Sequence, residues 1–217
     1  KYCFDLWGSQ ITEFCNEKIK SPVFLIGNSI GGIVSLKAAE MLRGQCQTVI
    51  LIDCAQRTMD DKRLLKSDLL MNFLRPIIKT LVRQRVISKT LFKRAANPKI
   101  IKKILHKAYP TGKNINDELI EILLKPSQRK NSSEAFRGFI NLFDDYLPTD
   151  LFGKIKTIHL IWGENDPWES LSEAKLWKQN FKNIQSLNII KNAGHCPHDE
   201  FPEETNKIIL KILQETK

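Results

Sequence analysis

The feature that most constrains the fold is a glycine-rich turn between a short apolar run and a helical pattern. Residues 23–26 are all apolar, residues 27–32 read GNSIGG, and residues 30–42 place apolar and small side chains at helical spacing. A continuous run of aliphatic and β-branched residues is typical of a strand buried on both faces of a parallel sheet. The sequence therefore predicts a strand, a tight turn at Ser29 and a helix packed closely against the strand.

The same alternation of strand and helix recurs along the chain. Further strands are predicted at residues 49–52, 158–161 and 187–190, the last of them weakened by Asn188. Helices are predicted at residues 7–15 and 168–181, and a final helix is predicted to begin at Pro202, where a missing N–H costs nothing. This order predicts an α/β fold with a parallel sheet between layers of helices.

A long helical insertion interrupts the alternation. Residues 57–148 carry helical patterns, including an apolar stripe over residues 65–82 that Pro76 is expected to kink or divide. An insertion of this length is too long for a simple crossover between strands. We therefore expect an α/β core in residues 1–56 and 149–217, with residues 57–148 as a helical cap.

The turn at residues 27–32 fits the pattern G-x-S-x-G when it lies between a strand and a helix. In that setting Ser29 is a candidate nucleophile, and the N–H of Ile30 at the helix start is a candidate oxyanion donor. Neighbouring Asn28 is expected to line the substrate site. The alternative is an ordinary glycine-rich turn without chemistry.

A serine nucleophile needs a base, and the chain has four histidines. His106 lies in the basic insertion and His159 within a predicted strand, so solvent and core are the expected surroundings. His195 follows the last predicted strand, at the sheet edge where active sites of open α/β sheets gather. We therefore expect His195 to be the base, with His198 beside the site or exposed.

The third member of a triad should lie between the serine and the histidine in the sequence. Asp166, in the loop after the strand at 158–161, is the candidate that would orient His195 and stabilise its imidazolium form. Trp168 in the same loop is expected to exclude water and to contact substrate. Glu164 is a nearby competitor, and Asp53 a more remote one.

Three motifs give the chain a family resemblance: GNSIGG at residues 27–32, WGENDPW at 162–168 and GHCPHDEFPE at 194–203. Together they resemble the α/β-hydrolase superfamily, and most closely the pheophytinase-like serine hydrolases of plants, algae and cyanobacteria. The resemblance implies carboxylic-ester hydrolysis, with removal of the phytyl chain of a chlorophyll-derived pigment as an example. It implies neither a metal nor an organic cofactor, and it implies a plastid stroma or a cyanobacterial cytoplasm as location.

Two departures accompany this resemblance. The family has about four strands before the serine turn and this chain has none, so we expect the C-terminal part of the fold, with the strand at 23–26 as a bare apolar edge. The absent part holds the second oxyanion donor in the family. The cap is also unusually rich in lysine.

Charge and cysteines narrow the setting further. Residues 60–130 contain 18 Lys/Arg against 6 Asp/Glu, whereas the remaining sequence carries a net charge of about −2. The basic stretch is either a solvated face or a surface for an anionic membrane or an acidic partner. No nucleic-acid motif accompanies it, so nucleic acid is not expected. The five cysteines form no CxxC pair, which favours a reducing compartment and indicates no metal site.

Two rival functions remain open on the sequence. Carbon–carbon bond hydrolases of the same superfamily also carry a GNS-type turn, and they act on diketone-like substrates. A hydrolase fold can also serve as a non-catalytic ligand receptor, although three intact triad residues argue against that.

Overall fold

The computed structural model describes residues 2–57, 77, 80, 81, 83–140, 142 and 145–215. By internal contacts the chain divides into two compact units. The α/β unit comprises residues 4–56, 107–114 and 146–217, and the helical unit comprises residues 1–3, 57–106 and 115–145. The stripe predicted as a helix at residues 65–82, with its kink at Pro76, lies for the most part outside the described residues.

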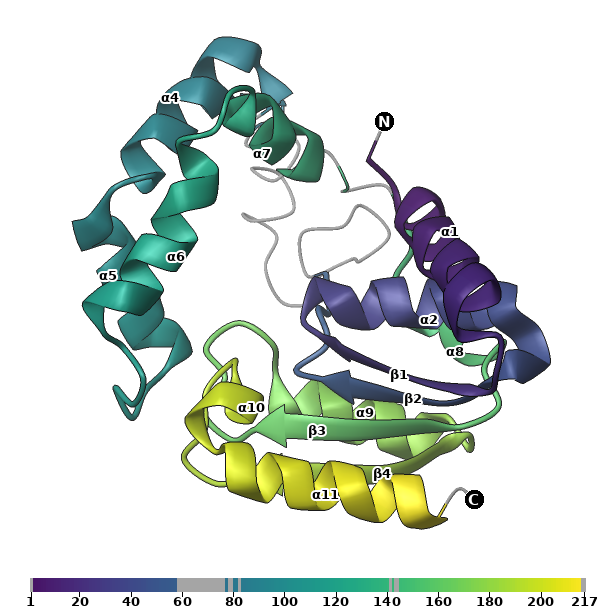
Figure 1. The fold of residues 1–217 in the computed structure, drawn as a ribbon. Coiled ribbons are helices and arrows are strands. Elements are labelled where there is room, and N and C mark those ends of the chain that lie inside the picture. Colours follow the sequence, from purple (N-terminus) through teal and green to yellow (C-terminus); the bar gives the residue numbers. More distant parts are fainter. Residues whose placement is uncertain are drawn as a thin grey trace. The chain divides into compact units, whose positions relative to one another are not determined.

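The α/β unit is built on a parallel sheet with the strand order β1-β2-β3-β4 (Figure 1). The strands are β1 (Val23–Asn28), β2 (Cys46–Ile52), β3 (Ile158–Gly163) and β4 (Ile184–Ile190). All four predicted strands are confirmed, and each is two or three residues longer than its apolar run. The fold class is therefore confirmed as an α/β sheet flanked by helices.

The register brings the carboxyl ends of the strands to one edge. Asn28 at the end of β1 pairs with Ile52 at the end of β2, and Gly163 pairs with Ile190 at the ends of β3 and β4. Residues that follow these strands therefore emerge side by side, which is where open α/β sheets bind their ligands.

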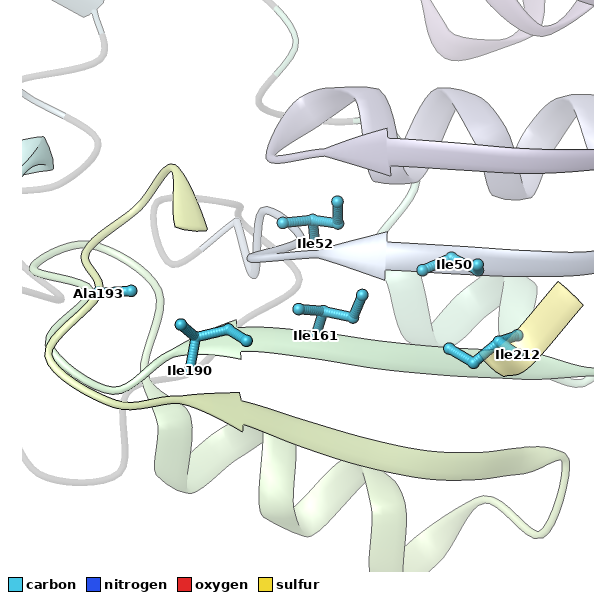
Figure 2. Close-up of a cluster of buried hydrophobic side chains, with 6 residues drawn as sticks. All are labelled: Ile50, Ile52, Ile161, Ile190, Ala193 and Ile212. Atoms are coloured by element: carbon cyan, nitrogen blue, oxygen red, sulfur yellow. The ribbon is translucent and has the colours of Figure 1, made fainter. Parts of the chain in front are cut away.

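The two sheet faces are covered by different helices. On one face α11 (Pro202–Glu215) contributes Ile212 to a cluster with Ile50, Ile52, Ile161 and Ile190 (Figures 1 and 2). The other face carries α2 (Ile30–Leu42), α8 (Pro148–Phe152) and α9 (Leu171–Asn180). Edge-to-face ring contacts link Trp162 of β3 to Trp177, and Trp177 to Phe152. The period of two along each strand thus buries both faces, as the continuous apolar runs predict.

The remaining helices match the expected pattern with shifted ends. α1 (Phe4–Phe14) continues as the π-helix η1 (Cys15–Ile19), and the 3-10 helix η2 (Arg43–Gln45) leads from α2 into β2. α10 (Pro197–Glu200) precedes α11, which begins at Pro202 as expected. The helix expected from residue 168 begins only at Leu171, because the N–H groups of Trp168 and Glu169 donate to the Asp166 side chain instead.

β1 is an outer strand of the described sheet. β2 and β3 are almost wholly buried, whereas Ile26 in β1 is 44% exposed. The expected apolar edge at residues 23–26 is therefore present among the described strands.

The described part of the helical unit contains α4 (Arg85–Ala95), most of α5 (Pro98–Ala108), α6 (Asp117–Ser127) and α7 (Ser132–Ile140). The rings of Phe92 and Phe136 join α4 to α7 at 5.3 Å, beside an ion pair between Arg85 and Glu134. Asn116 caps α6 by accepting a hydrogen bond from the N–H of Leu119 at 2.8 Å, a strong helix start.

Candidate active site

Ser29 sits in a strained turn directly after β1. Its φ of 53° and ψ of −123° are unusual for a residue with a side chain. Three backbone hydrogen bonds hold this conformation: Ser29 N–H donates to Ile52 O (2.9 Å), and Ser29 O accepts from the N–H groups of Gly32 (3.0 Å) and Ala55 (3.1 Å). The turn at Ser29 is thus fixed to the end of β2, in the geometry that projects a nucleophile above a strand end.

The three glycines of this turn differ in whether, and why, the structure requires glycine at their positions. A Cβ at Gly27 would clash with the Gly31 carbonyl, so only glycine fits there. At Gly31 a Cβ would meet nothing within 4 Å, so lack of space does not require glycine at that position. At Gly32 a Cβ would press on the Cys54 thiol, which explains how α2 packs so closely on the sheet.

His195 is buried in the loop that follows β4. Its N–H donates to Ala108 O at 2.8 Å, while the preceding Gly194 N–H donates to Glu200 Oε2 at 2.6 Å. A Cβ at Gly194 would clash with the Ala108 carbonyl and with Pro110. Gly194 is therefore needed for the close approach of two backbones.

Asp166 and His195 form a direct pair. His195 Nδ1 lies 2.8 Å from Asp166 Oδ2, and the Asp166 side chain is 1% exposed. Asp166 Oδ1 accepts from the N–H groups of Trp168 (2.8 Å) and Glu169 (3.1 Å). Burial acts to raise the pKa of Asp166, but the hydrogen bond and charge of His195 and the two backbone donors together lower it. A carboxylate held in this way orients the imidazole and stabilises its protonated form.

The competing acids have other partners. Glu164 Oε2 accepts from Asn192 N–H at 3.1 Å on the surface. Asp53 is fully buried and accepts from Gly163 N–H at 2.9 Å. Among the described carboxylates it is Asp166 that is within hydrogen-bond distance of the His195 ring.

The other histidines lie apart from this pair. His159 is buried in β3 beside Ser186 (2.8 Å), and burial lowers its pKa. His106 and His198 are exposed.

Asn28 connects the serine turn to the histidine loop. Its Nδ2 donates to Ile52 O at 3.2 Å and to His195 O at 3.0 Å. Both amide hydrogens are thus directed at backbone carbonyls. The sequence placed Asn28 at the substrate; these contacts give it a further, structural part in setting His195 relative to Ser29.

Trp168 stands edge-on to the His195 ring, with ring centroids 4.9 Å apart and an interplanar angle of 76°. It keeps 43% of its surface exposed. The indole therefore contacts the imidazole and still leaves part of its surface exposed. Its roles in excluding water and in contacting substrate stay predictions.

Two carboxylates near the pair of Asp166 and His195 are not predicted as site residues from the sequence. Glu200 is buried and accepts from Thr111 Oγ1 (2.5 Å) and from Gly194 N–H (2.6 Å), so it ties residues 107–114 to the histidine loop. Glu169 Oε2 accepts from Gln56 N–H at 2.7 Å, and burial raises the pKa of Glu169 to about 7. Glu200 belongs to the GHCPHDEFPE motif and Glu169 directly follows the WGENDPW motif, and these positions are the only signal that the sequence offers.

Ile30 is the first residue of α2, so its N–H belongs to the first helical turn, where donors lack helical partners. Its assignment as an oxyanion donor stays a prediction. Within the described residues no group of three His, Cys, Asp or Glu is arranged to hold a metal ion.

Comparison with known proteins identifies the family of the chain. A model of the alpha/beta hydrolase family matches residues 5–208, and the chain belongs to that family. The chloroplastic pheophytinase of Arabidopsis thaliana is 28% identical over a region that covers 96% of this chain and 44% of that protein. The chain thus spans less than half the length of this curated relative.

Solved structures share the fold at lower identity. A thermophilic esterase of Thermogutta terrifontis superposes with a TM-score of 0.70 at 20% identity, covering 99% of this chain and 73% of that one. A meta-cleavage product hydrolase of Pseudomonas fluorescens IP01 superposes with a TM-score of 0.73 at 15% identity, covering 100% and 74%. These structures show that the chain has the α/β-hydrolase fold, in agreement with its family.

Proposed function

We propose that the chain hydrolyses carboxylic esters with Ser29, His195 and Asp166 as a catalytic triad. The observation that carries the proposal is the buried 2.8 Å contact between His195 and Asp166, joined through Asn28 to the strained turn of Ser29. Neither a plain turn nor a ligand receptor requires this arrangement.

In the proposed mechanism each residue of the triad has its own task. Ser29 Oγ attacks the ester carbonyl while His195 Nε2 takes its proton, and Asp166 stabilises the imidazolium. The N–H of Ile30 stabilises the oxyanion. His195 then returns the proton to the departing alcohol and activates the water that hydrolyses the acyl-enzyme.

The proposed substrate is an ester with a large hydrophobic group, such as the phytyl ester of a chlorophyll-derived pigment. The relationship to a chloroplastic pheophytinase supports this choice, as do the apolar side chains exposed on each helix of the helical unit, which we propose is a cap over residues 57–148. The same relationship supports the plastid stroma or a cyanobacterial cytoplasm as location. None of the described helices is long and apolar enough to span a bilayer.

Ser29→Ala tests the proposal in the protein as its gene encodes it. We expect loss of fluorophosphonate labelling and of p-nitrophenyl-ester and phytyl-ester hydrolysis. Ser9→Ala, on the exposed face of α1, is the matched control and should keep both. Labelling and turnover that survive Ser29→Ala would refute the assignment.

Two rival activities are separated by the same assays. Faster turnover of a vinylogous diketone than of any ester would favour a carbon–carbon bond hydrolase. Ligand binding without Ser29-dependent labelling in the wild-type protein would favour a non-catalytic binder.

We also propose that the helical unit makes peripheral contact with anionic membranes. Residues 83–106 contain eight Lys/Arg and neither Asp nor Glu. In α5 the exposed lysines Lys99, Lys102 and Lys103 accompany the exposed apolar side chains Ile100 and Ile104. A basic helix with exposed apolar side chains is typical of binding at the headgroup level of anionic bilayers.

Vesicle co-sedimentation tests this contact. Reversing Lys99, Lys102 and Lys103 to Glu should abolish binding to phosphatidylserine-containing vesicles, and added salt should weaken wild-type binding. Reversal of the exposed Lys175, Lys182 and Lys207 in the α/β unit, which changes the net charge equally, is the control. Equal loss in both triple variants would show a net-charge effect instead of a surface.

A further inference from the structure

A second buried aspartate lies behind the proposed triad. Asp53 directly follows β2, with its N–H donating to Ile161 O at 3.0 Å and its Oδ1 accepting from Gly163 N–H at 2.9 Å. Its φ of 41° is rare for a residue with a side chain, so the surroundings must hold it in place. Asp53 therefore fixes the end of β2 to the end of β3, from which the Asp166 loop leaves.

The other oxygen of Asp53 lacks a donor. Oδ2 is fully buried, and no hydrogen-bond donor in the described part of the chain faces it. An ionised oxygen in that position would lose its water without compensation, which costs several kcal/mol. A protonated oxygen is itself a donor and needs only an acceptor.

The candidate acceptor is the Asp166 carboxylate. Burial is the largest cause that raises the pKa of Asp53 well above its ordinary range, and the charge of Asp166 and a side-chain hydrogen bond with Asp166 raise it further. Two adjacent carboxyl groups form such a bond only when one of them holds a proton.

The surrounding groups decide which carboxyl holds that proton. Asp166 receives hydrogen bonds from His195 Nδ1, Trp168 N–H and Glu169 N–H, all of which favour its charged form. Asp53 receives one, from Gly163. The negative charge of Glu169 also disfavours ionisation of Asp53. The buried thiols of Cys54 and Cys196, whose pKa values burial raises, supply no charge that would stabilise an ionised Asp53.

We propose that Asp53 is a neutral carboxylic acid that donates a hydrogen bond to the Asp166 carboxylate and so acts as a positioning residue of the triad. The inference rests on the proposed function of Ser29, His195 and Asp166. Asp53 would help to fix the Asp166 carboxylate without adding charge to the site.

Carbon-13 NMR of the aspartate carboxyl groups tests the protonation directly and needs no activity. In labelled wild-type protein at pH 7, one aspartate signal should have the chemical shift of a protonated acid, and Asp53→Asn should remove that signal. Asp150→Asn, at an exposed carboxyl at the start of α8, should leave it. A spectrum in which every aspartate is ionised at pH 7 would overturn the proposal, whether or not the protein is an esterase.

Kinetics test the positioning. Asp53→Leu removes both the donor and the acceptor, and kcat should fall about 10–100-fold, as for other partners that orient catalytic ligands. Asp53→Asn can donate to Asp166 and accept from Gly163, so it should restore most of kcat and keep the acid limb of kcat/KM where it is in wild type. If Asp53 were ionised, Asp53→Asn would remove a negative charge near His195 and move that limb to lower pH, which would contradict the proposal. Circular dichroism establishes that both variants are folded.

Discussion

The α/β unit and the helical unit differ in how they treat polar and apolar groups. In the α/β unit His195 and the Asp166 side chain are buried and Ser29 is half-buried, and hydrogen bonds that involve Asn28, Glu200 and Asp166 hold the loops of this site in place. In the helical unit each described helix leaves apolar side chains exposed, as at Val86, and residues 83–106 contain eight Lys/Arg and neither Asp nor Glu. The hydrogen bonds of the α/β unit fix the positions of a few side chains, whereas the helical unit exposes many of its side chains.

This difference assigns the proposed chemistry to one unit and the proposed substrate choice and location to the other. Hydrolytic chemistry requires fixed positions and should respond steeply to small changes in the α/β unit. Under the proposed function, substrate choice and location depend on exposed side chains of the helical unit, so this unit should tolerate substitution. The following predictions test that separation, beginning with the largest effect.

Asp166→Asn should reduce kcat by roughly 10⁴-fold, because an amide favours the wrong tautomer of His195 while leaving the fold intact. The assay is p-nitrophenyl-ester hydrolysis. Glu164→Gln, in the same loop, is the control and should behave like wild type. Equal losses in the two variants would mean that loop structure, not the pairing with His195, was lost.

Gly194→Ala should destabilise the α/β unit by about 1–3 kcal/mol, because the added methyl group clashes with the Ala108 carbonyl and must displace one of two backbones. Urea unfolding measures the loss, and activity should fall with it. Gly31→Ala is the matched test, since open space surrounds that position. An unchanged unfolding midpoint in Gly194→Ala would show that the two loops are not held together.

Asn28→Ala should lower kcat about 10–100-fold with little change in KM, because His195 loses the hydrogen bond that fixes its backbone to the serine turn. The division between kcat and KM decides between the two interpretations of Asn28. A rise in KM at constant kcat would identify it as a substrate-binding residue instead.

Glu169→Gln should flatten the pH dependence of stability. Glu169 has a folded-state pKa of about 7 against an ordinary value of 4.5, so the folded protein binds the proton more tightly. Its contribution to stability is therefore present below pH 4.5 and is lost as pH rises toward 7. Urea unfolding at pH 5 and pH 8 should show a smaller decline in the variant than in wild type. An equal decline would assign the effect to other groups.

Asn116→Ala in the helical unit should have the smallest effect on catalysis. Loss of the cap on α6 should cost about 1 kcal/mol, seen as a lower unfolding midpoint, while hydrolysis of a short soluble ester stays within about twofold of wild type. A large loss of turnover would show that the helical unit takes part in the chemistry.

The sequence predicts the strands and helices correctly where the pattern lies within one short segment. Continuous apolar runs identified all four strands, and the proline at 202 marked the start of α11. The shifted start of α9 could not be foreseen, since the Asp166 side chain captures backbone groups that a helix would otherwise use.

The residues of the candidate site also fall into two groups, those that a local pattern predicts and those that it does not. Ser29, Asp166 and His195 were chosen from their order and from their places after strands. The contacts of Asn28, Glu200 and Asp53 depend on which loops meet at the sheet edge, and no pattern within a single segment records that meeting. The reason for Gly194 was likewise invisible, because Ala108 is distant in the sequence.

The outer position of β1 has a consequence for assembly. Among the described strands β1 is paired on one side only, and its last residue, Asn28, immediately precedes the proposed nucleophile. A strand added along that edge, from another segment or a second molecule, would complete the backbone hydrogen bonding of β1. A strand that pairs with β1 at this edge would then also stiffen the turn at Ser29.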